Sequence, residues 1–372
     1  GWTFPATLAA GNWDALVAGY PSLARLANIQ CENCHGPNDS DAHMAADGSR
    51  QSMSTGMCAQ CHDSGTHHYR PAEWTTTPHA NLELAREEGT YEARATSAGH
   101  CGRCHAGQGF LVYAENLEAG NPNSFTGTEA YFRGLGLQDS EVEPQTCQTC
   151  HDPHDATNPH QIRIYDEIAM LPGGFGVAGV GMGALCMSCH NTRNGYSGTP
   201  ATAWLHDDTA PTSRLTSYSG PHYSAQADVL MGVNAFFVGP GGYDVSPHAA
   251  ITDTCVTCHM SESEFGEGYG DHTWTIGEEI CASCHGEGVS GEAIKATVEA
   301  RLHDVETAIA AAVVGDVADV ITAATDTVVV RAWDEATDCY SSSSSSSSTV
   351  TLAAAPTAAS ETHIHGQTGF CF

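Results

Sequence analysis

The chain has 372 residues, of which 44 are acidic and 13 are basic, so its formal net charge at neutral pH is −31. Such a charge repels nucleic acid, and with Lys295 as the single lysine the chain has no basic patch for an anionic membrane. No run of about 20 apolar residues is present that would predict a transmembrane segment.

The dominant pattern from residue 31 to residue 285 is Cys-x-x-Cys-His, which occurs seven times. We number these motifs 1 to 7 in chain order. Their cysteines are Cys31, Cys34, Cys58, Cys61, Cys101, Cys104, Cys147, Cys150, Cys186, Cys189, Cys255, Cys258, Cys281 and Cys284, and their histidines are His35, His62, His105, His151, His190, His259 and His285. Two thiols at this spacing bond the vinyl groups of a c-type heme, and the adjacent histidine ligates the iron. A redox or zinc Cys-x-x-Cys does not need that histidine every time, so the sequence predicts seven covalently bound c-type hemes.

Residues 1–290, the predicted seven-heme region, offer few of the side chains that build an ordinary hydrophobic core. The chain is rich in glycine, with 39, and only 8% of its residues are aromatic. We therefore expect a mostly irregular fold with short α-helices wrapped around a chain of hemes, and folding that depends on heme attachment. The short gaps between motifs 1 and 2 and between motifs 6 and 7 predict close heme pairs. Residues 191–251, rich in Gly, Pro, Ser and Tyr, predict loops with a short helix at 225–232.

Residues 291–372 form a second predicted unit. Apolar residues recur at helical spacing, which predicts one long amphipathic helix to about residue 321 that packs on the heme core. The apolar positions are Ile294, Val298, Leu302, Val305, Ile309, Val313, Val317 and Val320. Residues 327–333 and 349–353 predict a few short strands around the serine run at 341–348. Cys339 and Cys371 could close this tail with a disulfide, or remain as two free thiols.

Fourteen histidines lie outside the motifs, twice as many as seven hemes need for a second ligand. They are His43, His67, His68, His79, His100, His154, His160, His206, His222, His248, His272, His303, His363 and His365. Iron held by two histidines is six-coordinate and offers no open position for substrate, which favours electron transfer over catalysis. No motif has lysine in place of its histidine, a mark of nitrite-reducing multiheme enzymes.

Several segments resemble those of large extracellular multiheme cytochromes, a group that includes the cytochromes that polymerise into conductive filaments. They are CENCHGP followed by His43, CHDSGTHH, CHDPHD with NPHQIR, PHYSAQADVLMG, SPHAAITDTCVTCHM and GDHTW, which span residues 28–290. The resemblance implies bis-histidine hemes stacked in a ladder, a head-to-tail homopolymer with a distal ligand often donated across the subunit interface, and exchange of electrons with redox partner proteins or an extracellular acceptor.

Carried over residue by residue, the resemblance implies that the distal ligands are His43, His68, His79, His154, His222, His248 and His272. His154 lies three residues after His151, too close to reach over the same heme, so we expect it to serve a neighbouring one. His67 and His160 are alternatives to His68 and His154. His100 could ligate an adjacent heme, and His363 and His365 are either solvated or reach a heme of the next subunit.

Heme attachment of this type takes place outside the cytoplasmic membrane, so we expect an exported protein at an extracellular, cell-surface or periplasmic address. The leading hypothesis is an electron conduit, without enzymatic activity, that forms the subunit of an extracellular filament. Two alternatives stay open: a soluble multiheme shuttle that never polymerises, and a reductase of nitrogen or sulfur oxyanions. The reductase would need one five-coordinate heme beside a basic pocket.

Overall fold

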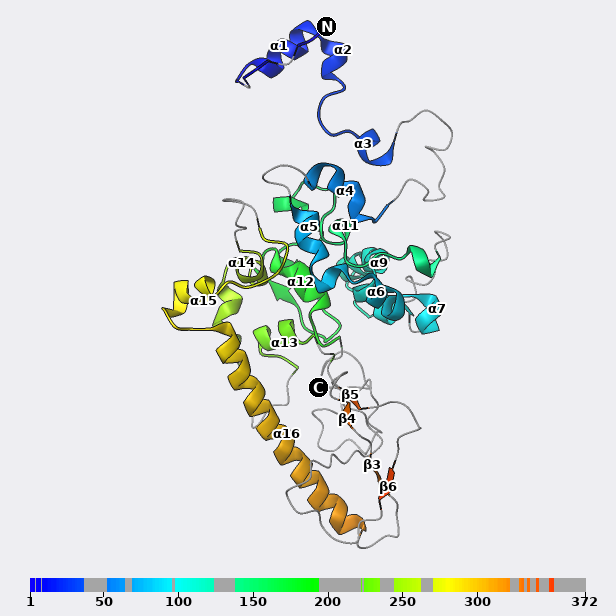
Figure 1. The fold of residues 1–372 in the computed structure, drawn as a ribbon, viewed down its shortest axis with the longest axis vertical. Coiled ribbons are helices and arrows are strands. Elements are labelled where there is room, and N and C mark those ends of the chain that lie inside the picture. Colours follow the sequence, from blue (N-terminus) through cyan, green and yellow to red (C-terminus); the bar gives the residue numbers. More distant parts are fainter. Residues whose placement is uncertain are drawn as a thin grey trace.

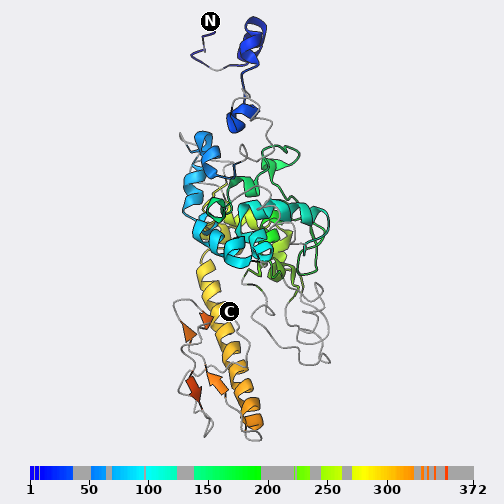
Figure 2. The same cartoon turned by 90° about the vertical axis from the view of Figure 1, so that its right-hand side faces the viewer.

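The computed structural model describes residues 1–3, 5–7, 9–36, 52–63, 69–95, 98–123, 138–193, 222, 224–234, 244–261, 270–321, 328–330, 333–334, 339–340 and 348–350. The described chain is elongated (Figures 1 and 2). Helices α1 (Asn12–Gly19) and α2 (Pro21–Ala24) lie at one end, a body of short helices lies in the middle, and α16 (Gly291–Ile321) extends from the other side of the body.

The body consists of short helices joined by irregular segments, as expected from the sequence. The α-helices are α3 (Cys31–His35), α4 (Thr55–His62), α5 (Arg70–Thr75), α6 (Leu82–Gly89), α7 (Tyr91–Arg94), α8 (Ala98–His105), α9 (Gly107–Glu118), α11 (Cys147–Cys150), α12 (Gly183–Cys189), α13 (Gln226–Met231), α14 (Cys255–His259) and α15 (Glu278–His285). Single 3-10 turns are η2 (Pro78–Ala80), η4 (Asp139–Glu141), η5 (Pro159–Gln161) and η7 (Pro247–Ala250). The predicted helix at 225–232 is α13.

Every motif lies on a helix or at its end, namely α3, α4, α8, α11, α12, α14 and α15. The reason is geometric, because residues three and four apart share one face of a helix, so a single turn brings both cysteines and the histidine together. In motifs 4 and 5 the helix ends at the second cysteine, and His151 and His190 follow directly after it. Side-chain caps hold some of these short helices: Ser54 accepts from Gly56 N at the start of α4.

A small apolar core fixes the middle of the body. It joins Phe110, Tyr113 and Leu117 of α9 to Met187 of α12, and it continues into the hairpin of β1 (Glu167–Ile168) and β2 (Val177–Ala178). Cys104, Cys189 and Cys255 pack against this cluster. The Tyr113 hydroxyl donates to the carbonyl oxygen of Ser188 at 3.0 Å. The core therefore fixes motifs 3, 5 and 6 relative to one another.

The C-terminal unit contains the short strands that the sequence predicts. Strand β3 (Val328–Val330) pairs antiparallel with β6 (Ser348–Val350), and β4 (Trp333–Asp334) pairs antiparallel with β5 (Cys339–Tyr340). Most of the serine run and Cys371 lie outside the described residues, so the disulfide stays a prediction. Within the described ranges, no helix has the length and apolar character that a bilayer crossing demands.

Helix α16 has the predicted bounds but not the predicted packing. Ile294, Val298, Leu302 and Val305 are 54%, 49%, 62% and 54% exposed. The helix projects away from the body (Figures 1 and 2), so these side chains do not reach the core. The expectation that this apolar stripe packs on the heme region is therefore wrong for its described part.

Candidate heme-binding sites

Five of the seven motif histidines lie opposite a histidine from outside the motifs. The ring centres are 6.0 Å apart in His35–His154, 6.1 Å in His79–His190, 6.1 Å in His105–His222, 6.4 Å in His151–His272 and 5.8 Å in His248–His285. A metal ion lies about 2 Å from the nitrogen of each imidazole that binds it, and the ring centre lies about 1.1 Å beyond that nitrogen. Two rings on opposite sides of one metal ion therefore have their centres about 6 Å apart. Each pair thus has the separation that one iron requires.

The histidines opposite motifs 1, 3, 4, 5 and 7 are five of the seven that the resemblance implies. His154 lies opposite His35 of motif 1 and not opposite its neighbour His151; that it ligates the heme of motif 1 stays a prediction. The rings are nearly parallel in His35–His154, at 12°, and nearly perpendicular in His79–His190, at 78°.

Most of these residues share a sequence signal. His79, His154, His222 and His248 each directly follow a proline. Because proline fixes its own φ, it sets up a tight turn with a defined exit direction. His79 and His248 indeed lie in the 3-10 turns η2 and η7. The fifth Pro-His, at His160, is not in any of the five pairs, and its backbone carbonyl oxygen accepts a hydrogen bond from His151 Nδ1.

Hydrogen bonds orient several of the rings through Nδ1. His151 Nδ1 donates to the carbonyl oxygen of His160 at 2.7 Å, and His272 Nδ1 donates to that of Gly270 at 3.0 Å. His259 Nδ1 makes the same type of bond to Trp274 O at 3.1 Å, and His222 Nδ1 lies 3.0 Å from Ser224 Oγ. Metal-bound histidines are typically held in this way, because a bond at one nitrogen fixes the tautomer and leaves the other for the metal.

In three of the five pairs, His79–His190, His105–His222 and His151–His272, burial favours the neutral form of the rings, which is the form that binds metal. Burial lowers the pKa of His79 and His272 to about 4, and burial with the nearby Arg193 lowers that of His222 to about 4. Burial also lowers the pKa of His151 and His190. Neutral imidazole is the ligating state, so these sites do not require a proton to leave at neutral pH before iron binds.

The structure describes only some of the other candidate ligand histidines. His43, His67, His68, His206, His363 and His365 lie outside the described residues. The distal ligands of motifs 2 and 6 therefore stay predictions. His100 lies close enough to His222 for each ring's charge to matter to the other, whereas the His303 side chain is exposed on α16.

Contacts between cysteines show which motifs are neighbours. The motif cysteine sulfurs are the atoms that would bond the predicted hemes, so their positions relate one motif to the next. Three pairs of motif cysteines lie close enough for each thiol to shift the pKa of the other: Cys58 with Cys147, Cys104 with Cys189, and Cys186 with Cys255. Motif 2 thus adjoins motif 4, and motif 5 adjoins both motif 3 and motif 6.

Weaker electrostatic contacts complete this order. The charge of Cys34 raises the pKa of Cys58, and the charges of Cys281 and Cys284 raise that of Cys258, so motif 1 lies near motif 2 and motif 6 near motif 7; the close heme pairs stay predictions. Cys150 acts on Cys186, which brings motif 4 beside motif 5. The motifs therefore follow one another in space as 1, 2, 4, 5, 6 and 7, with motif 3 beside motif 5.

Comparisons with known proteins add little to this geometry. No protein-family model matches the chain, and no curated protein matches it. Among solved structures it is similar to the crystal structure of the outer cell wall cytochrome OcwA, with a TM-score of 0.44 and 18% sequence identity. The match covers 80% of this chain and 62% of the OcwA chain, so the chain spans less than two thirds of that protein. We base no inference on so distant a likeness.

Proposed function

We propose that this protein is a heptaheme c-type cytochrome that conducts electrons along a chain of bis-histidine hemes, as the subunit of an extracellular filament. The observation that carries the proposal is the set of five imidazole pairs 5.8 to 6.4 Å apart, each containing one motif histidine. The cysteines would hold the hemes covalently, and the paired histidines would ligate the iron. When bound, the hemes supply reversible one-electron chemistry.

The protein's own contribution is to position these groups and tune them. Six-coordinate iron changes oxidation state with little movement of its ligands, and two imidazoles leave no position for a substrate. The bonds from His151 and His272 to backbone carbonyls hold the rings and raise their basicity, which stabilises the oxidised iron. The order 1, 2, 4, 5, 6, 7 gives a route from the N-terminal end of the body to the base of α16.

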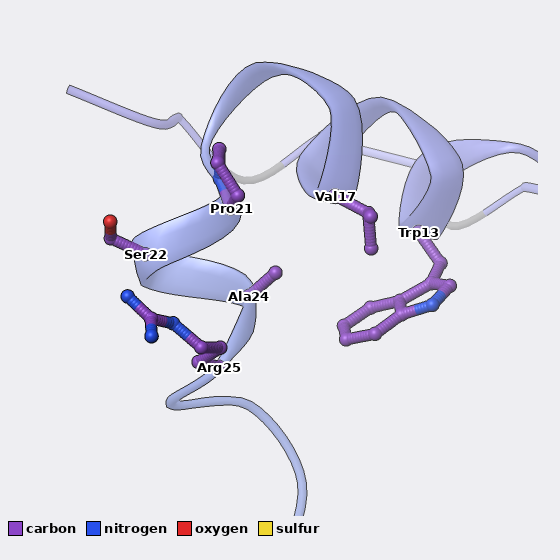
Figure 3. Close-up of a pocket in the computed structure, with 6 residues that line it drawn as sticks. All are labelled: Trp13, Val17, Pro21, Ser22, Ala24 and Arg25. Atoms are coloured by element: carbon purple, nitrogen blue, oxygen red, sulfur yellow. The ribbon is translucent and has the colours of Figure 1, made fainter.

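Exposed apolar surfaces at opposite ends of the molecule support head-to-tail assembly. At one end, α1 and α2 form a shallow pocket lined by Trp13, Val17, Pro21, Ser22, Ala24 and Arg25, with the Trp13 ring along one side (Figure 3). At the other end, α16 exposes its apolar stripe. Two different surfaces that bind each other produce an open filament when the rotation does not close a ring.

Cryo-electron microscopy of native secreted material tests the assembly. Filaments in which the end hemes of successive subunits touch would support the conduit. Discrete particles would favour the soluble shuttle and refute the polymer. A five-coordinate heme that faces a cavity with arginines would favour an oxyanion reductase instead.

Rapid-mixing reoxidation of the reduced protein tests the electron transfer itself. Dithionite-reduced protein mixed with a ferric acceptor should be reoxidised at all hemes within one kinetic process, because every site connects to the same chain. A fraction of hemes that never reoxidises would contradict a continuous path.

A further inference from the structure

His222 lies opposite His105 of motif 3, with the ring centres 6.1 Å apart, but no regular element holds its backbone. The other four paired histidines from outside the motifs lie in 3-10 turns or in hydrogen-bonded turns. His222 instead belongs to an irregular segment ahead of α13. The direction of its ring therefore depends on contacts between this segment and the rest of the fold.

These contacts run to the residues directly after the second cysteine of motif 5. The backbone nitrogen of His222 donates to Thr192 O at 3.3 Å, and that of Ala227 donates to His190 O at 2.9 Å. Asn191 is fixed in turn, because its amide donates to two carbonyl oxygens of α12, both at 2.9 Å. The end of motif 5 is thus a firm support for the segment that carries His222.

Ser224 connects the His222 ring to this support. Its Oγ lies 3.0 Å from the carbonyl oxygen of Asn191 and 3.0 Å from His222 Nδ1. A hydroxyl has one proton and a carbonyl oxygen can only accept, so Ser224 donates to Asn191 and accepts from His222 Nδ1. This bond fixes the tautomer in which Nε2 carries no proton and is available to iron.

Asp228 of α13 joins the same two segments through a buried carboxylate, since 1% of the residue is exposed. Its Oδ2 accepts from Thr192 N at 2.8 Å, and its Oδ1 accepts from Thr192 Oγ1 and Asn234 Nδ2, both at 2.7 Å. Hydrogen bonds to a carboxylate are about twice as strong as those between neutral groups. Asp228 therefore holds the start of α13 against the chain that follows motif 5.

We propose that Ser224 and Asp228 are positioning residues that hold His222 over the iron site of motif 3, with the chain after motif 5 as their anchor. The inference rests on the proposed function, because it takes His222 as the distal ligand of that site. Without the anchor His222 moves away, and His105 is the one ring of the pair that remains. Coordination at motif 3 thus depends on the fold of motif 5.

This arrangement couples two neighbouring sites. His190, the histidine of motif 5, accepts a bond from Ala227, and the same stretch of chain carries the His222 ring that faces motif 3. Residues that orient a ligand in this way commonly affect metal binding as strongly as tenfold or more. One stretch of chain therefore sets the ligand of one site relative to the other.

Asp228→Ala in the full holoprotein tests the proposal. The reduced variant should bind one more carbon monoxide per chain than the wild type, as His222→Ala should, because each change leaves the motif 3 iron without its distal ligand. The double variant should also bind one more and not two, since both changes open the same site. Carbon monoxide titration followed by absorption measures all three.

Asp139→Ala is the matched control. Asp139 Oδ2 also accepts from a distant backbone nitrogen, that of Glu92 at 2.7 Å, but it lies in η4, which carries no histidine. The control should bind as much carbon monoxide as the wild type. Additional binding there would show that any loosening of the body opens a site, and it would refute the positioning role.

Ser224→Ala tests the orientation of the ring separately, and it decides the matter if Asp228→Ala does not fold. Carbon monoxide must displace His222 to bind at motif 3, and loss of the bond to Nδ1 should make this displacement about tenfold more favourable. Ser224→Thr keeps the hydroxyl and should restore the wild-type affinity. Equal affinities in Ser224→Ala and the wild type would refute the inference.

The results separate this inference from the proposed function. If His222→Ala opens one site and Asp228→Ala opens none, the inference fails and the cytochrome assignment stands. If the double variant opens two sites, Asp228 supports a different ligand and the inference fails as well. A chain without attached hemes would refute the proposed function instead.

Discussion

Removing one predicted distal ligand should open one iron site of seven. The His79 ring lies opposite His190 with a ring-centre separation of 6.1 Å, so the expected iron position is roughly 3 Å from the centre of each ring. In His79→Ala the His190 ring is the one that remains of this pair. The other ring close to His79 is that of Trp274, at 4.5 Å, and an indole does not ligate iron. The site should become five-coordinate and high-spin.

The reduced variant should bind one more carbon monoxide per chain than the wild-type protein. In the oxidised absorption spectrum, about one seventh of the hemes should be high-spin. His160→Ala is the matched control, since His160 also follows a proline, but it supports His151 through a backbone carbonyl that alanine retains. Carbon monoxide titration checks both variants. If His79→Ala binds no more than the wild type, or if His160→Ala behaves in the same way, the assignment of His79 is refuted.

Three further predictions follow from the same geometry. The ring planes are nearly parallel in His35–His154, at 12°, and nearly perpendicular in His248–His285, at 71°. The oxidised protein should therefore show two classes of low-spin electron paramagnetic resonance signal. His248→Ala should delete a signal of the more anisotropic class, which comes from perpendicular rings. Tyr113→Phe removes the buried bond to Ser188 O and should lower the free energy of unfolding of the holoprotein by about 1–2 kcal/mol in a denaturant titration; no change would show that the bond is not formed. The chain expressed without heme attachment should lack cooperative unfolding, and a cooperative transition would show that its small core suffices.

Local features of the fold were predictable from the sequence because they depend on nearby residues. The motif helices follow from the one-turn spacing of cysteine and histidine, and the bounds of α16 follow from the apolar repeat. The packing of α16 was not predictable in the same way. An apolar stripe indicates that one face of a helix packs against another surface, but it does not say whether that surface belongs to the same chain. Val298 and Leu302 are about half exposed, so the described part of this chain does not bury them.

The identity of the site residues was more accessible than their pairing. The resemblance implied His79, His154, His222, His248 and His272 as distal ligands, and the structure places each of them opposite a motif histidine. Which motif each one faces depends on long-range packing.

The contact between motifs 2 and 4 shows why spacing alone is insufficient. Cys58 lies beside Cys147, close enough for each thiol to shift the pKa of the other, although motif 3 separates them in the sequence. Chain distance limits which motifs can be neighbours but does not choose among them. Here the core around Phe110 and Met187 packs against Cys104 of motif 3 and Cys189 of motif 5, so motif 3 lies beside motif 5. Motif 2 then contacts motif 4 instead of motif 3.

The central claim is that the seven Cys-x-x-Cys-His motifs each hold a heme covalently, and the intact mass of the denatured holoprotein tests it most directly. The account predicts the mass of the polypeptide plus seven hemes, unchanged by denaturation because thioether bonds survive it. A mass equal to that of the bare polypeptide, with or without metal ions lost on denaturation, would contradict the account.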